Sequence, residues 1–265
     1  MAGRYYIQSL ARGLLILETI ASSPRGLSLT EVAATLRLPK ATAFAFLHTF
    51  ELLGYLERNP ATKTYSPGLK VLDLGFAYLS DRTILDVAQP YLRSLSEECG
   101  ATTDISVLDG GQIMTLALEK VWRMVDYRTN VGSRLPVHCS ASGKAQLIDH
   151  TPSQLTALLG PEPYPMHGPN TITTLAGLVE DLHRARQRGY ALTDEELVAG
   201  LRSAAAPIRD REGHIVAAIC VSSPTVIVSH EHLDQVLASK VVRAARQISA
   251  ALTVDSGTHR LSLEE

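Results

Sequence analysis

The chain has 265 residues, of which 45% are apolar and 20% are charged, and its net charge is −2. No apolar run approaches the ~18 residues of a membrane span, and the N-terminus lacks the apolar segment of a signal peptide, so we expect neither a membrane protein nor a secreted one. The cysteines Cys99, Cys139 and Cys220 are odd in number and far apart, which argues against a disulfide framework or a zinc motif. We therefore expect a cytoplasmic globular protein of one large or two modest domains.

The charge is distributed unevenly along the chain. Residues 1–82 contain nine Lys and Arg residues against six Asp and Glu residues, a net charge of +3. Residues 83–265 carry a net charge of −5. A basic first part and an acidic second part are typical of a protein that binds DNA through the first part only.

Two short helical patterns near the N-terminus are separated by a tight break. The first pattern begins after Ser28, which forms the sequence signature of a capping box with Glu31. Pro39 cannot continue that helix but suits the first turn of the next one, which runs from Lys40 and stops at Gly54. A helix-turn-helix has this geometry, and an ordinary helical hairpin has the same pattern.

Two strand patterns directly after this segment favour the first interpretation. Residues 55–58 and 63–66 are strand-like, and Asn59-Pro60-Ala61-Thr62 between them is a turn sequence. A helix-turn-helix followed by a β-hairpin is a winged helix, and the combination is more specific than either half. The wing would offer Arg58 and Lys63 to DNA phosphates.

The rest of the chain alternates helical and strand patterns. A helical pattern over residues 69–79 is apolar on nearly every side and predicts a linker helix that packs against a partner subunit. Other helices are predicted over residues 9–21, 84–99, 142–149, 152–159, 174–188 and 231–252, and strands over residues 103–108, 113–118, 124–129, 203–208 and 214–221. Hairpins interspersed with helices indicate an α+β fold with an antiparallel sheet.

Short segments in both halves of the chain share one family pattern. They include Leu29-Thr-Glu-Val-Ala33, Leu38-Pro-Lys-Ala-Thr42, Tyr65-Ser-Pro-Gly-Leu69, Ser142-Gly-Lys-Ala145 and Gly200-Leu-Arg202. In order and spacing these segments resemble the IclR family of bacterial transcriptional regulators. The resemblance implies a winged helix-turn-helix DNA-binding domain over residues 1–68, a linker helix over 69–82, a GAF-like antiparallel-sheet effector domain over 83–254 and a flexible tail over 255–265. It also implies a homodimer or a dimer of dimers that binds double-stranded operator DNA and a small-molecule effector, with no cofactor.

The DNA contacts are expected on the second helix of the motif and on the wing. The candidate residues are Lys40, Ala41, Thr42, Phe44, Ala45, His48, Arg58 and Lys63. Family members often carry an arginine at the position of Ala45 and a His or Tyr at that of Phe44. Because this chain lacks the arginine, apolar contact to thymine methyl groups and readout of DNA shape weigh more here than bidentate contacts to guanine.

The effector contacts are expected where small residues precede a helix, at Cys139–Lys144. Unobstructed N–H groups at a helix N-terminus favour an anion such as a carboxylate or phenolate, although a plain N-cap turn explains the same residues. Alternation in the last strand places Cys220 and Ser222 on one face. The resemblance adds the acidic segment after Tyr190, so the candidate set is Ser140, Ala141, Ser142, Gly143, Asp194, Glu195, Ser203, Cys220 and Ser222.

Two other functions use the same residues. A hydrolase with Ser140, Ser142 or Cys139 as nucleophile would need a base and an orienting acid beside that turn. A ligand-binding protein whose winged helix mediates only protein contacts is the second alternative. We expect no enzyme activity and no catalytic residue. We also expect no metal site, because His230 and His232 are spaced i, i+2 and point apart at a helix start.

Overall fold

The computed structural model describes residues 5–80, 83–121 and 129–255. The chain divides into two compact units, Met1–Arg82 and Thr83–Glu265, and each unit is considered by itself. None of the helices in the described ranges has both the length and the apolar character that a membrane span requires.

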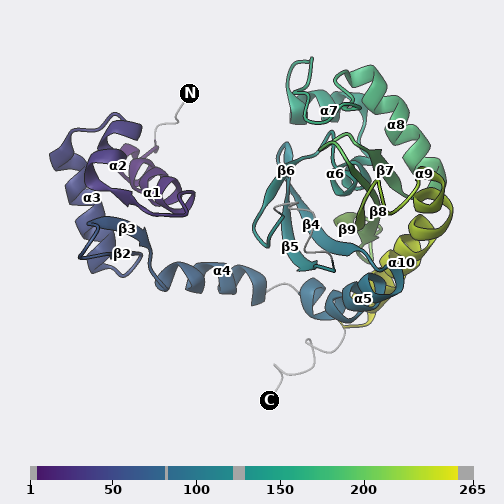
Figure 1. Cartoon of the computed structure of the whole chain (residues 1–265), viewed down its shortest axis with the longest axis horizontal. Coiled ribbons are helices and arrows are strands. Elements are labelled where there is room, and N and C mark those ends of the chain that lie inside the picture. Colours follow the sequence, from purple (N-terminus) through teal and green to yellow (C-terminus); the bar gives the residue numbers. More distant parts are fainter. Residues whose placement is uncertain (1–4, 81–82, 122–128, 256–265) are drawn as a thin grey trace. The chain divides into compact units, whose positions relative to one another are not determined.

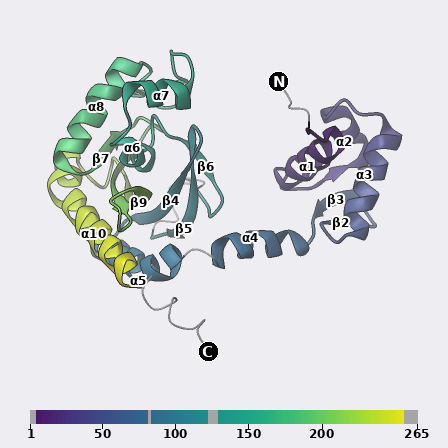
Figure 2. The same ribbon diagram turned by 180° about the vertical axis from the view of Figure 1, so that it is seen from behind.

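The first unit consists of short helices and a small antiparallel sheet (Figures 1 and 2). The strand order is β1-β3-β2. The elements in chain order are α1 (Gln8–Ala21), β1 (Leu27–Ser28), α2 (Leu29–Thr35), α3 (Lys40–Leu52), β2 (Leu56–Arg58), β3 (Thr64–Pro67) and α4 (Lys70–Ser80). The predicted helices and hairpin are confirmed, whereas β1 was not predicted because two residues are too few to show alternation.

Local signals explain the breaks in this unit. The Ser28–Glu31 capping box is present at the start of α2, and Pro39 is the N-cap of α3. Asn59 begins the hairpin turn, and its Oδ1 accepts hydrogen bonds from the backbone N–H groups of Ala61 and Thr62. The core behind these turns is formed by Ile16, Ile20, Val32, Ala33, Ala43, Leu47, Leu56 and Tyr65.

The second unit is built on a six-stranded antiparallel sheet of order β6-β5-β4-β9-β8-β7. The strands are β4 (Thr102–Asp109), β5 (Gln112–Glu119), β6 (Arg134–Pro136), β7 (Ala191–Asp194), β8 (Leu201–Arg209) and β9 (Ile215–Pro224). The predicted α+β fold class is confirmed. Strands β6 and β7 were not predicted, because each is short and becomes a strand only by pairing with a neighbour. The strand predicted over residues 124–129 lies almost entirely outside the described residues.

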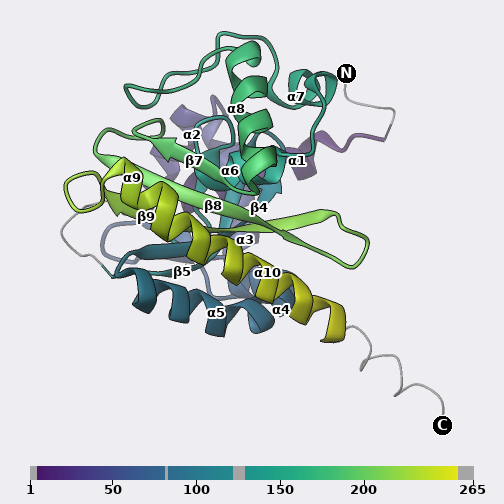
Figure 3. The same ribbon diagram turned by 90° about the vertical axis from the view of Figure 1, so that its right-hand side faces the viewer.

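Helices cover both faces of this sheet. Figure 3 shows α5 (Thr83–Cys99) and α10 (Ala238–Asp255) on one side and α6 (Ala141–Leu147), α7 (Pro152–Leu159) and α8 (Leu175–Arg188) on the other. The predicted C-terminal helix is interrupted, since α9 (His230–His232) and α10 flank a π-helical turn at Leu233–Leu237.

The strand register decides which residues lie under α6. Asp104 of β4, Cys220 of β9 and Ala205 of β8 form one row across the sheet, and Ser222 pairs with Ser203 two residues further along. Because side chains alternate along a strand, these residues share one face. That face packs against α6, so the predicted common face of Cys220 and Ser222 is buried beneath this helix.

Candidate functional site

Helix α3 presents one exposed face. Its buried side is formed by Ala43 and Leu47, which are fully covered by the core of the first unit. The residues at the remaining positions of the predicted contact surface are exposed, namely Lys40, Ala41, Phe44, Ala45 and His48, while Thr42 is half-buried. The rings of Phe44 and His48 stack with centroids 5.7 Å apart. The structure therefore brings the predicted residues of α3 together on a continuous solvent-facing surface.

Basic side chains lie at both ends of this motif. Lys40 is the first residue of α3, and Arg58 and Lys63 are exposed on the hairpin. Arg37 is a basic residue that the sequence analysis did not include. It is exposed in the turn before α3 with φ 52°, three residues from Lys40. Its position in the turn, rather than its spacing on a helix, was the signal that could have identified it.

The turn before α6 is closed rather than open. Ser140 is the N-cap, and its Oγ accepts a hydrogen bond from the Gly143 N–H at 3.2 Å and donates one to the Pro136 carbonyl at 2.7 Å. A Cβ atom on Gly143 would lie 2.4 Å from Cα and O of Val137, so glycine is required for close packing of two backbones. Ala141 and Ser142 follow in the first turn, and both are buried.

A buried polar layer lies between α6 and the sheet. Ser203 and Ser222 are hydrogen-bonded to each other with Oγ atoms 2.8 Å apart, and Cys220 Sγ lies 3.7 Å from Ser222 Oγ. Ser142 Oγ lies 3.5 Å from Oδ2 of Asp104. The structure thus brings four predicted effector residues together and adds Asp104, which the sequence analysis placed in a strand without a role.

The carboxyl group of Asp104 has a pKa far above the ordinary value for an aspartic acid. Burial raises its pKa to about 7, although hydrogen bonds from Cys220 and Ser142 act in the opposite direction. Cys220 lies directly opposite Asp104 in the sheet, and burial together with this carboxylate raises the pKa of the Cys220 thiol above its ordinary value. A carboxyl group with this pKa changes its protonation state near neutral pH, so it can donate a hydrogen bond to a bound anion.

Asp194 and Glu195, which were predicted to contact the effector, have other partners in the structure. Asp194 is bound to Arg202 at 2.6 Å and lies 3.4 Å from a ring nitrogen of His230. Glu195 accepts a hydrogen bond from the Gly200 N–H at 2.9 Å. The structure does not place these two carboxylates with the polar layer under α6, since Asp194 alternates with Thr193, which pairs with Ser203. The neighbouring Glu196 points inward instead.

Glu196 belongs to a buried ion cluster around Lys144. Lys144 is 0% exposed, and its Nζ lies 2.8 Å from Oδ2 of Asp181 and 2.6 Å from the carboxylate of Glu196. Burial raises the pKa of Glu196 to about 6 despite the nearby ammonium group. The cluster joins α6, α8 and the segment after β7, and it therefore holds α6 in position over the polar layer.

Cys139 lies near two imidazole rings, which bears on the hydrolase alternative and on metal binding. Its Sγ and one ring nitrogen each of His138 and His167 lie within 4.8 Å of one another. Burial raises the pKa of the Cys139 thiol to about 12. The thiol is therefore protonated at neutral pH, which is the opposite of an activated nucleophile. Among the described residues, neither Ser140 nor Ser142 has a hydrogen bond to a histidine.

Comparison with protein-family models identifies both parts of the chain. Residues 9–60 match the IclR helix-turn-helix domain, and residues 76–250 match the C-terminal domain of the bacterial transcriptional regulator IclR. The chain belongs to the IclR family. It is therefore a DNA-binding transcriptional regulator of the IclR type, as the resemblance of its segments predicted.

Individual IclR-family proteins match nearly the whole chain. The transcriptional repressor IclR of Escherichia coli is 32% identical over 247 residues, which cover 92% of this chain and 90% of that protein. The repressor AllR of Escherichia coli is 31% identical over 246 residues with the same coverage. These relatives are repressors, which agrees with a regulator rather than an enzyme.

Solved structures show the same architecture. The protein RHA06195 from Rhodococcus sp. RHA1 is 34% identical, with a TM-score of 0.81 over 93% of this chain and 98% of the other. An IclR homologue from Microbacterium hydrocarbonoxydans, solved in complex with 4-hydroxybenzoate, is 26% identical with a TM-score of 0.80 over 92% of this chain and 99% of the other. The second structure shows that a relative of this fold binds a small aromatic acid.

Proposed function

We propose that this IclR-family protein binds operator DNA through α3 and the wing, and that a small organic acid bound in the polar layer under α6 modulates this binding. The exposed stripe of α3 carries the proposal for DNA. The apolar side of the helix is covered by the core, while Lys40, Phe44 and His48 are free to enter a major groove.

The polar layer supports the class of effector. Ser142, Ser203, Ser222 and Asp104 offer hydroxyl groups and a carboxyl group that is protonated part of the time at neutral pH. These groups donate hydrogen bonds, and a carboxylate or phenolate accepts them. The 4-hydroxybenzoate bound by the Microbacterium hydrocarbonoxydans relative carries a carboxylate and a hydroxyl group, and it is the first candidate for this chain.

Exposed apolar residues support a homodimer. On α1 and just before it, Tyr6, Ile7, Leu10 and Leu14 are each at least half exposed. On α4, Leu72 and Leu74 are 51% and 59% exposed. Exposed apolar side chains of this size are suited to a protein–protein contact. We propose that two copies pair through some of these side chains and so place two α3 helices on the two half-sites of one operator.

The double substitution Lys40→Ala with Thr42→Ala tests the DNA surface. We expect the affinity for DNA upstream of the protein's own gene to fall at least tenfold, which corresponds to about 1.4 kcal/mol, because a phosphate contact and a helix N-terminal contact are lost. The dependence of log K on log salt, measured by gel shift, should decrease by about one counterion. Arg93→Ala is the control, since it removes an exposed positive charge from α5 in the second unit. Unchanged affinity of the double variant would show that α3 does not bind the operator.

The substitution Ser222→Ala with Ser203→Ala tests the effector site. We expect an organic acid present at ~100 times its Kd to add ~2.7 kcal/mol to the stability of the parent protein, and a thermal-shift screen headed by 4-hydroxybenzoate measures this. The double variant should lose the shift, whereas Ser239→Ala, an exposed serine of α10, should keep it. A full shift in the double variant would place the effector elsewhere.

A further inference from the structure

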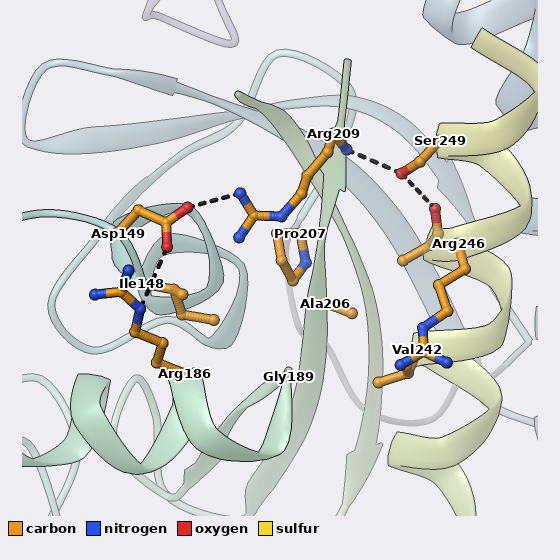
Figure 4. A pocket seen from close by; sticks show the side chains of 11 residues that line it. Ile148, Asp149, Arg186, Gly189, Ala206, Pro207, Arg209, Val242, Arg246 and Ser249 are labelled. Carbon is orange, nitrogen blue, oxygen red and sulfur yellow. Dashed lines mark hydrogen bonds and ion pairs between the residues drawn. The ribbon is translucent and has the colours of Figure 1, made fainter. Parts of the chain in front are cut away.

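A groove in the second unit lies away from the polar layer under α6. It is a cavity of about 550 Å³ between the end of α8, strand β8 and helix α10 (Figure 4). This volume is in the range of pockets that hold small molecules. Its apolar lining is formed by Ile148, Ala206, Pro207, Val242 and Ala245.

The charged residues of the groove leave positive charge uncompensated. The lining contains Arg186, Arg209 and Arg246 and a single carboxylate, Asp149. Asp149 accepts a hydrogen bond from Arg209 Nη1 at 2.6 Å and lies 3.7 Å from Arg186 Nε. The side chain of Arg246 has neither an ion pair nor a hydrogen bond among the described residues. One carboxylate therefore faces three guanidinium groups.

The guanidinium groups retain donors for a ligand. The two side-chain hydrogen bonds of Arg209, to Asp149 and to the Gly213 carbonyl, both use Nη1. Its Nη2 and Nε consequently have no acceptor in the described part of the chain. Figure 4 shows Arg209 and Arg186 on the Asp149 side of the groove and Arg246 beside Val242, with the apolar side chains of Ala206 and Pro207 between them. The groove thus has two cationic ends and an apolar middle.

The backbone at this edge of the sheet does not favour a peptide strand. Strand β7 pairs with β8 only from Arg202 to Ala205, so within the described residues no strand pairs with β8 on that side beyond Ala205. Pro207 has no N–H, and the Arg209 N–H donates to Ser249 Oγ at 2.9 Å. A strand added here would find no donor at these two positions, whereas a ligand that binds to side chains needs none.

We propose that this groove binds a small elongated dianion with a carboxylate at each end of an apolar spacer. Arg246 binds one carboxylate, and Arg209 and Arg186 bind the other, since a guanidinium group matches a carboxylate with two parallel hydrogen bonds. The spacer lies on Ala206 and Pro207. The site is separate from the proposed effector site and stands or falls independently of it.

Isothermal titration calorimetry of the full chain with glutarate and adipate tests this site. We expect one dicarboxylate bound per chain, and at least a tenfold loss of affinity in Arg246→Gln, which breaks no side-chain hydrogen bond or ion pair among the described residues. Arg243→Gln is the matched control, because it removes the same charge from the same helix outside the groove, where Arg243 pairs with Glu98. This control should bind within twofold of the parent.

Butyrate and inorganic phosphate complete the experiment. Butyrate has only one carboxylate and phosphate is compact, so both should bind at least tenfold more weakly than the better dicarboxylate. Phosphate binding as tight as that of the dicarboxylates would show an adventitious ion only and overturn the proposal. The same conclusion follows if neither dicarboxylate binds, if Arg246→Gln binds like the parent, or if Arg243→Gln loses as much affinity as Arg246→Gln.

Discussion

Replacing Lys144 by Met is expected to lower the free energy of unfolding of the second unit by about 3–5 kcal/mol, because removing one partner of a buried ion cluster leaves the other charges uncompensated. Lys144 is 0% exposed, and without its ammonium group the carboxylates of Asp181 and Glu196 would face each other with 12% and 10% of their side chains exposed. Urea unfolding followed by circular dichroism measures the change.

Two further variants separate the ion cluster from simple packing. Arg184→Met removes another partner of Asp181, but this arginine is 51% exposed, so we expect a loss below about 1 kcal/mol. Adding Glu196→Gln to Lys144→Met should recover part of the stability, because it removes one of the uncompensated charges. If Lys144→Met unfolds at the same urea concentration as the parent, the cluster does not stabilise the fold.

Replacing Asp104 by Asn is expected to remove a pH dependence from the stability of the second unit. The folded state raises the pKa of Asp104 from 3.8 to about 7, so it binds a proton more tightly than the unfolded state does. The stability of the second unit that depends on a neutral Asp104 is present in full below about pH 4, and it is lost as the pH rises toward 7. A shift of this size corresponds to roughly 4 kcal/mol as an upper figure.

The measurement is urea unfolding of the parent and of Asp104→Asn at pH 5 and pH 8. We expect the variant to gain stability relative to the parent at pH 8, by about 2–4 kcal/mol, and to gain much less at pH 5. Asp86→Asn is the control, since it changes an exposed carboxylate of α5 and should leave the difference between the two pH values unaltered. If the variant and the parent differ in stability by the same amount at both pH values, the fold does not raise the pKa of Asp104.

The first unit could be predicted closely because its signals are local. The Ser28–Glu31 capping box, Pro39 at the start of α3 and the turn at Asn59 each act within a few residues of the chain. Helical spacing alone separated the buried Ala43 and Leu47 from the exposed residues of α3. The common face of Cys220 and Ser222 was also predictable, because alternation along one strand depends only on neighbouring residues.

The residues of the second unit that could not be predicted from the sequence depend on distant partners. Asp104 and Ser142 are 38 positions apart in the sequence, and they meet only because β4, β9 and α6 are packed together. The acidic residue that points inward, Glu196, is selected by the geometry of the segment after β7, in which Glu195 has φ 57°. Three adjacent acidic residues carry no pattern that distinguishes them.

By itself, therefore, the amino-acid sequence determined the winged helix, the α+β class and the family, because caps, turns and apolar periodicity act over a few residues. Lys144 illustrates what only the tertiary structure decided. Its spacing from Ala141 and Ile148 put it on the inner face of α6, yet a buried lysine is tolerated only when carboxylates from elsewhere reach it. Asp181 and Glu196 lie 37 and 52 positions away, and only folding brings them to the ammonium group.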